Sequence, residues 1–160
     1  MILDRFRLSE RVAIVTGSGR GIGRGIALGF AEAGAHVVCS ARTVEQIEAA
    51  AAKVRGFGSR ALAVPCDVTD RAQLENLVSQ TMKEFGRIDI LVNNAGIDGD
   101  QAITADSSLE NWLRVMSINI DGVYYGMKFV LPVIHDGRLF APSNPDFEIH
   151  RIFDPRTPLE

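Results

Sequence analysis

The chain has 160 residues, enough for one globular domain of ordinary size. Hydrophobic residues make up 46% and charged residues 23%, proportions that exclude a disordered chain or a collagen-like repeat. The net charge of −3 provides no broad basic surface for nucleic acid or an anionic membrane, and no apolar run has the about 20 residues of a membrane span. With two cysteines and no apolar signal stretch at the N-terminus, we expect a cytoplasmic protein without disulfides.

Four short, almost continuous apolar runs occur in the first part of the chain. Such runs are typical of strands that are buried on both faces of a sheet. They span Arg11–Thr16, Ala35–Ala41, Arg60–Pro65 and Ile88–Asn93. Segments of helical periodicity separate them, so the alternation predicts right-handed strand–helix–strand units and a parallel α/β sheet.

Two of the predicted helices lie between these strands. Thr43–Arg55 is expected to end at Gly56. Its apolar stripe consists of Val44, Ile47, Ala51 and Val54. Asp70–Phe85 begins with Asp70 and Gln73 in the spacing of a capping pair.

A further helix follows the fourth strand. It is expected to begin at Ser107, because Glu110 stands three residues later in the spacing of a capping box. Its apolar residues are Leu109, Trp112, Val115 and Met116.

The pattern changes after Pro132. Four of the six prolines fall in the last 19 residues, and neither periodicity continues there. We therefore divide the chain into an α/β portion over residues 1–134 and a divergent, poorly ordered Pro-rich tail over residues 135–160. The one strand-like piece of this tail is Arg138–Ala141.

A glycine-rich segment joins the first strand to the first helix. Glycine occupies every second position from Gly17 to Gly25, in a T-G-x-x-x-G-x-G pattern that begins at Thr16. Glycines at such a junction permit a tight turn and let backbone N–H groups at a helix N-terminus approach a phosphate. The alternative is a flexible turn, but the position between a buried strand and an amphipathic helix favours a dinucleotide site.

The end of the second strand distinguishes between the two nicotinamide cofactors. An NAD site of this kind usually has an acidic residue about 20 residues after the glycines, to bind the ribose 2′-hydroxyl. Here the strand ends Cys39-Ser40-Ala41-Arg42-Thr43, without a carboxylate. Arg42, together with Arg20 in the glycine loop, favours NADP over NAD through bonds to a 2′-phosphate. The alternative is that Arg42 is a solvated residue at a helix entrance.

With three further motifs, this loop resembles the short-chain dehydrogenase/reductase family over residues 8–134. The motifs are Asp67-Val68 after the third strand, Asn93-Asn94-Ala95-Gly96 at the end of the fourth, and Asn119 in the helix that follows. The resemblance implies a Rossmann-like doubly wound parallel sheet of strand order 3-2-1-4, shortened to about four strands. It implies that Asp67 contacts the adenine and that Asn119 is the structural asparagine of a catalytic tetrad. The residues expected at the cofactor are Gly17, Gly19, Arg20, Gly21, Ile22, Gly23, Arg42, Asp67, Val68, Asn94, Ala95 and Gly96.

In the family a serine, a tyrosine and a lysine complete the tetrad, and the last two act in proton transfer to the substrate oxygen. The one Tyr-x-x-x-Lys is Tyr124 to Lys128, which lies on the same helix as Asn119 instead of on a later one, so we interpret it as helix packing with a surface lysine. Ser143 can be aligned with the catalytic serine, but no tyrosine follows it. We therefore expect an oxidoreductase-like chain that is catalytically incomplete.

The missing half has further consequences. The fourth strand becomes a sheet edge, which predicts a marginal, aggregation-prone protein with an incomplete oligomer interface. A small-molecule substrate is expected only if the chain is completed, and we expect no metal site. The alternative function is a non-catalytic fragment that pairs with a full-length relative through its open edge.

Overall fold

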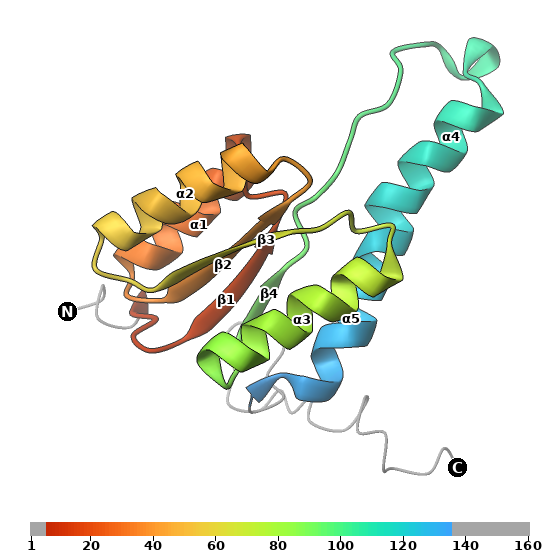
Figure 1. Ribbon diagram of the computed structural model, residues 1–160. Helices are drawn as coiled ribbons and strands as arrows, with labels where there is room; N and C mark the ends of the chain where they lie inside the picture. Colours follow the sequence, from red (N-terminus) through yellow and green to blue (C-terminus); the bar gives the residue numbers. More distant parts are fainter. Residues whose placement is uncertain (1–5, 136–160) are drawn as a thin grey trace, which may run out of the picture.

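The four apolar runs form one parallel sheet in the computed structural model, which describes residues 6–135 (Figure 1). The strands are β1 (Val12–Thr16), β2 (His36–Ala41), β3 (Ala61–Pro65) and β4 (Ile90–Val92). Their order in the sheet is β3-β2-β1-β4, and all three pairings are parallel. The predicted α/β class and strand order are confirmed. Because neighbouring strands pair in register, Thr16 opposite Ser40 and Ala41 opposite Pro65, their carboxyl ends lie at one edge of the sheet.

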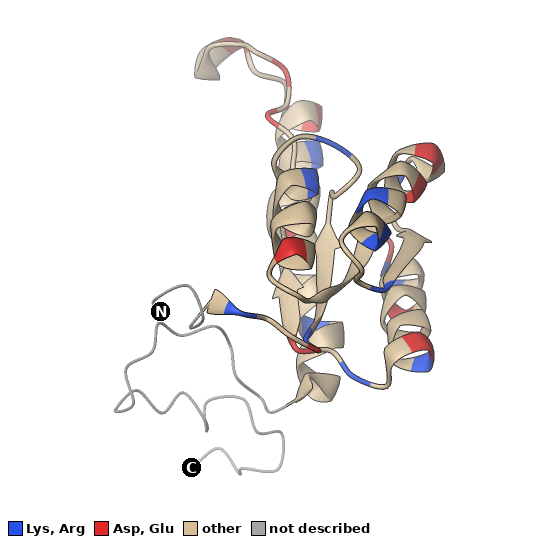
Figure 2. Ribbon diagram, turned by 90° about the vertical axis from the view of Figure 1, so that its left-hand side faces the viewer, with Lys and Arg blue, Asp and Glu red and all other residues tan. Residues whose placement is uncertain are grey.

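Helices cover both faces of this sheet (Figure 1). Helices α1 (Gly21–Glu32) and α2 (Val44–Gly56) lie on one face, and α3 (Arg71–Phe85) and α5 (Gly122–Val130) lie on the other. Side chains of β2 alternate between the two layers, since Val37 and Cys39 pack in the cluster with α1 and α2 while Val38 packs with α3 and α5. The strands contain no Lys, Arg, Asp or Glu, which lie on the helices and loops (Figure 2).

Helix α3 begins where the sequence predicted. Asp70 Oδ1 accepts hydrogen bonds from the backbone N–H groups of Ala72 at 2.9 Å and Gln73 at 3.2 Å. The Gln73 side chain donates to Asp70 Oδ2, but its Oε1 accepts from the N–H of Asp67 rather than from that of Asp70. Gln73 therefore bonds to both Asp67 and Asp70, and so it also fixes the segment between β3 and α3.

Two other helix boundaries differ from the prediction. Helix α2 includes Gly56, and the left-handed residue that follows is Gly58, with φ +84°. Helix α4 (Leu109–Met116) begins after Ser108, whose Oγ accepts from the N–H of Asn111. Ser107 does not cap it, because its own N–H bonds to the carbonyl of Ile103 and ends a preceding 3₁₀ turn, η2 (Thr104–Asp106).

A π-helical turn, η3 (Ser117–Asp121), joins α4 to α5, and a 3₁₀ turn, η4 (Leu131–Val133), follows α5. Helix α4 extends beyond the carboxyl end of the sheet (Figure 1). Its predicted apolar stripe is only partly covered: Leu109 is 71% exposed and Trp112 is 57% exposed, whereas Val115 and Met116 are half-buried. The buried positions on α4 and α5 are instead Asn111, Gly122, Gly126 and Val130.

Residues 136–160, which make up nearly all of the predicted tail and include Arg138–Ala141 and Ser143, lie outside the described residues. In the part of the chain that is described, no helix combines the length and hydropathy needed to cross a bilayer.

Candidate dinucleotide-binding site

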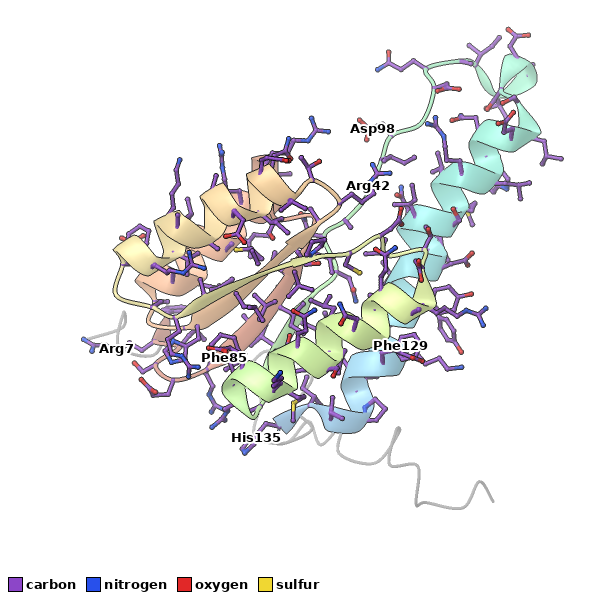
Figure 3. The ribbon with its side chains drawn as sticks, in the orientation of Figure 1. Arg7, Arg42, Phe85, Asp98, Phe129 and His135 are labelled. Atoms are coloured by element: carbon purple, nitrogen blue, oxygen red, sulfur yellow. The ribbon has the colours of Figure 1, made fainter. Side chains whose placement is uncertain are left out.

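Four loops from different parts of the sequence meet at the carboxyl edge of the sheet. The glycine loop follows β1, Arg42 follows β2, Asp67 comes after β3 and Asn94 after β4. In Figure 3, Arg42 and Asp98 lie at this end of the molecule, whereas Arg7, Phe85 and His135 lie at the other end. The chain order reverses between β1 and β4, and open parallel sheets bind their ligands beside such a reversal.

Thr16, the last residue of β1, connects the loops after β1 and β4. Its Oγ1 accepts from the N–H groups of Asn94 at 3.0 Å and Ala95 at 3.1 Å, and donates to the carbonyl of Val92 at 3.3 Å. The Asn94 side chain in turn donates to the carbonyls of Thr16 at 2.9 Å and Gly17 at 3.3 Å. These bonds hold the glycine loop against the end of β4.

The glycines of the loop have two different surroundings. Gly17 has φ +66°, and a Cβ there would be 2.8 Å from Asn94 Nδ2. A Cβ on Gly23 would collide with the same Asn94 atom and with the carbonyl oxygen of Gly17, and one on Gly19 would be 2.9 Å from Cβ of Gln46. Gly21 has φ +54° and no atom within 4 Å of its Cβ position. The loop is thus tightly packed on its protein side and open at Gly21.

Ser18 attaches the same loop to β2. Its backbone N–H donates to the carbonyl of Ser40 at 3.1 Å, and its Oγ accepts from the N–H of Ser40 at 2.8 Å. Ser18 is fully buried, so these bonds are shielded from water. The loop is therefore fixed to both neighbours of β1 by the protein's own groups.

The first turn of α1 has no side-chain cap. Arg20 precedes the helix without a side-chain hydrogen bond to it, and the first turn contains no acidic residue. Asp70 and Ser108, in contrast, cap α3 and α4 with their side chains. Ile22 in this turn is 79% exposed. Uncapped N–H groups beside the open Gly21 fit the pyrophosphate of a dinucleotide.

The loops after β2 and β3 present opposite charges. The Arg42 side chain is 68% exposed, and its Nη1 lies 4.0 Å from Oδ2 of Asp67. Val68, predicted at the cofactor, has its side chain in the core, where a Cβ on Gly122 would be 2.7 Å from its Cγ2. The Val68 side chain is therefore part of the core that holds α5 and not of an open surface.

Asn119 lies in the π-helical turn and holds the segment after β4. Its Oδ1 accepts from the N–H of Ile97 at 2.9 Å, and its Nδ2 donates to the carbonyl of Ile97 at 2.8 Å. Gly96 lies against this side chain, since a Cβ on it would be 3.3 Å from Asn119 Oδ1. Tyr124 and Lys128 are exposed on α5, with Lys128 Nζ 5.8 Å from the centre of the Tyr124 ring.

Several residues of this edge had no assigned role in the sequence analysis. Ser18 binds the loop to β2, Gln46 packs on Gly19, and Thr69 donates its N–H and hydroxyl to Asp67 Oδ1. Ser18 and Thr69 could have been found from the sequence, because a serine or threonine next to a glycine motif or an aspartate often forms such local bonds.

The thiols of the chain are unsuited to catalysis or metal binding here. Burial raises the pKa values of Cys39 and Cys66 to about 11, so both remain protonated at neutral pH. Among residues 6–135, no three His, Cys, Asp or Glu side chains gather closely enough to hold a metal ion.

The strand order, the fixed glycine loop and the uncapped first turn of α1 place the chain in the doubly wound α/β class, in which dinucleotides bind at such an edge. The chain belongs to the short-chain dehydrogenase family, whose model matches residues 11–139. Members of this family of oxidoreductases bind a nicotinamide cofactor, either NAD or NADP.

The chain is similar to meso-2,3-butanediol dehydrogenase of Serratia marcescens, 35% identical over 79% of this chain and 49% of that protein. Another similar protein is 2-dehydro-3-deoxy-D-gluconate 5-dehydrogenase of Dickeya dadantii, 42% identical over 78% of this chain and 48% of that protein. The crystal structure of a short-chain type dehydrogenase/reductase from Mycobacterium marinum superimposes with a TM-score of 0.79 and 37% identity, covering 83% of this chain and 53% of the other. The chain spans about half the length of the relatives that it matches.

Proposed function

We propose that this chain binds NADP(H) at the carboxyl edge of its sheet, as the cofactor-binding portion of an oxidoreductase that acts on alcohol and carbonyl groups. When bound, the dinucleotide supplies hydride-transfer chemistry at its nicotinamide ring. The observation that carries the proposal is the glycine loop, which Thr16 and Asn94 hold in place next to the uncapped N-terminus of α1. The protein's own hydrogen bonds fix the loop, so little ordering opposes binding.

The preference for NADP(H) is supported by the charges at the end of β2. Cys39 to Thr43 contain no carboxylate that would accept a bond from a ribose 2′-hydroxyl. Arg42 presents a largely exposed guanidinium there, and Arg20 is exposed in the neighbouring glycine loop. A guanidinium binds phosphate through charge-assisted, often paired, hydrogen bonds.

The test is isothermal titration calorimetry of the 160-residue chain with NADPH and, separately, with NADH. We expect NADPH to bind more tightly than NADH, and Arg42→Gln to remove most of that difference. Lys53→Gln is the matched control, because it removes one positive charge from an exposed position in the last turn of α2, the helix that follows Arg42. Equal affinities in the unmodified chain, or equal effects of the two substitutions, would contradict the assignment of Arg42. Binding of neither cofactor would contradict the proposed function itself.

We further propose that these 160 residues do not catalyse hydride transfer by themselves. Asn119 is the one tetrad residue assigned, and its side chain is occupied in holding Ile97. No tyrosine follows Tyr125 in the sequence. The chain with NADP⁺ and 2,3-butanediol, the alcohol named for the Serratia marcescens relative, should show no turnover. Turnover that is lost in Tyr124→Phe would instead assign Tyr124 as the acid–base group.

A second candidate function is association with a full-length relative. It is favoured by the large apolar side chains that α4 and α5 expose, among them Leu109, Trp112 and Leu113. The test mixes this chain with a purified full-length homologue and measures both the mass of the complex and the activity of the homologue. A stable complex or altered activity would support this function, and unchanged mass and activity would refute it.

A further inference from the structure

A second charged residue, on the loop after β3, lies beside Arg42. Arg42 Nη1 lies 4.0 Å from Asp67 Oδ2, and the two residues follow strands that are neighbours in the sheet. If Arg42 binds the 2′-phosphate, the carboxylate of Asp67 therefore lies close to that phosphate. This inference rests on the proposed function and concerns how strongly the site distinguishes the two cofactors.

The carboxylate of Asp67 is the fixed member of this pair. Its Oδ1 accepts from the hydroxyl of Thr69 at 2.8 Å and from the N–H of Thr69 at 3.0 Å. The backbone around it is also bonded, since its N–H donates to Gln73 Oε1 at 2.9 Å and its carbonyl accepts from the N–H of Asp70 at 3.0 Å. With Oδ1 occupied by Thr69, the oxygen directed to Arg42 is Oδ2.

Arg42 is the adaptable member. Its side chain is 68% exposed, against 33% for Asp67, and an ion pair at 4.0 Å with such exposure is weak. A 2′-phosphate can therefore take the guanidinium, but it must compete with a carboxylate that Thr69 holds beside it. NADH has no phosphate at this position, so it leaves the pair intact.

We propose that Asp67 sets the degree of NADP(H) preference by competing with the 2′-phosphate for Arg42 and by repelling that phosphate. Asp67 is then a specificity-determining residue, in addition to any contact that it makes with the adenine. Thr69 is a positioning residue that acts through Asp67. Removing the negative charge of Asp67 should improve NADPH binding relative to NADH.

The experiment measures Kd for NADPH and NADH in the 160-residue chain and in Asp67→Asn. Any loss of an adenine contact affects both cofactors equally and cancels in the ratio of the two constants. We expect Asp67→Asn to raise Kd(NADH)/Kd(NADPH) about two- to fivefold, the range of a partly exposed ion pair. The increase should shrink at high salt, because exposed charges are screened.

Asp70→Asn is the matched control, because it removes the same charge three residues away, and asparagine also caps a helix well. This variant should leave the ratio unchanged. In an Arg42→Gln background, the effect of Asp67→Asn should fall to less than half, since the guanidinium is no longer the shared partner. Thr69→Val, which removes the hydroxyl bond to Oδ1, should shift the ratio in the direction of Asp67→Asn, whereas Thr69→Ser should not.

An unchanged or lower ratio in Asp67→Asn would overturn the inference, and so would an increase of the same size in the Arg42→Gln background or in Asp70→Asn. These outcomes leave the proposed function intact as long as the unmodified chain binds NADPH. If the unmodified chain binds neither cofactor, the proposed function fails and the inference fails with it.

Discussion

The hydroxyl group of Thr16 connects the ends of β1 and β4 through three hydrogen bonds. Thr16→Val keeps the shape of the side chain but leaves the N–H groups of Asn94 and Ala95 without that acceptor. We expect the free energy of unfolding to fall by about 1–3 kcal/mol, the cost of partly buried groups that lose a partner. Thr16→Ser is the control, because it keeps the hydroxyl and loses one methyl group, for about 1 kcal/mol or less. Urea unfolding of both variants measures the difference, and equal losses would show that the hydroxyl contributes nothing.

Asp89 also connects β1 and β4, but at the amino ends of these strands. Its carboxylate is buried and accepts from Arg87 Nη2 at 2.6 Å, from the N–H of Val12 at 2.8 Å and from Arg11 Nη1 at 3.0 Å. Burial by itself raises the pKa of Asp89, but the bonds from Arg87, Val12 and Arg11 outweigh it and hold the pKa below its ordinary value of 3.8. The folded protein therefore binds the Asp89 proton more weakly than the unfolded chain does.

The sign of the pH dependence follows from this lowered pKa. The stabilisation is fully present above the ordinary pKa of 3.8 and is lost as the pH falls below it, through the folded-state value. Asp89→Asn should reduce the free energy of unfolding by about 1–3 kcal/mol at neutral pH and make its loss below pH 4 less steep. Urea unfolding between neutral pH and pH 3 measures both effects. A variant with the same slope as the unmodified chain would assign the acid sensitivity to other carboxylates.

At the scale of elements, glycines fix how closely α5 approaches the sheet. A Cβ on Gly122 would lie 2.7 Å from Cγ2 of Val68, and one on Gly126 would collide with the side chain of Asn93. Gly122→Ala should lower the free energy of unfolding by about 1–3 kcal/mol, because α5 must move outward. Gly29→Ala in α1 is the control, since its Cβ position has no atom within 4 Å, and it should stabilise the protein by about 0.5–1 kcal/mol. Thermal unfolding that places both variants on the same side of the unmodified chain would contradict this interpretation.

The sequence predicted those elements whose own residues determine them. The strands of the sheet are continuous apolar runs, and Asp70 caps α3 through contacts with residues two and three positions away. Their order came from the resemblance to the family, because apolar runs do not specify their neighbours. Predictions that depended on distant contacts were less accurate.

The α4–α5 segment shows why. Three of its four buried positions are Asn111, Gly122 and Gly126, which a hydrophobic pattern does not identify; the fourth is Val130. Asn111 is buried because its Oδ1 accepts from the N–H of Asp100, and the glycines are buried because other side chains fill the space beside them. The candidate site also combines local and distant contacts. The sequence motifs identified the glycine loop and Asn94 as candidates. The hydrogen bonds that Thr16 makes between them depend on the pairing of β1 with β4, which the motifs do not show.

At the scale of the whole molecule, the described residues leave one long apolar surface uncovered. We define the α4–α5 stripe as the exposed large apolar side chains of α4, the π-helical turn η3 and α5. Its members are Leu109, Trp112, Leu113, Ile120, Tyr124 and Met127, which are between 36% and 71% exposed. Exposed apolar surface of this extent is a common site of association between chains.

We therefore expect the chain to self-associate through the α4–α5 stripe as its concentration rises. Trp112 is the only tryptophan, so its fluorescence emission should shift to shorter wavelength when association buries it. Leu113→Glu places a charge in the stripe at a position that is 58% exposed, and it should keep the chain monomeric because a buried, unpaired charge is costly. Phe57→Glu, at a 53% exposed position after α2 on the other face of the sheet, is the control and should associate like the unmodified chain. Sedimentation velocity over a wide concentration range, with emission spectra of the same samples, distinguishes the outcomes. If Phe57→Glu suppresses association as strongly as Leu113→Glu, association depends on general surface hydrophobicity and the stripe has no special role.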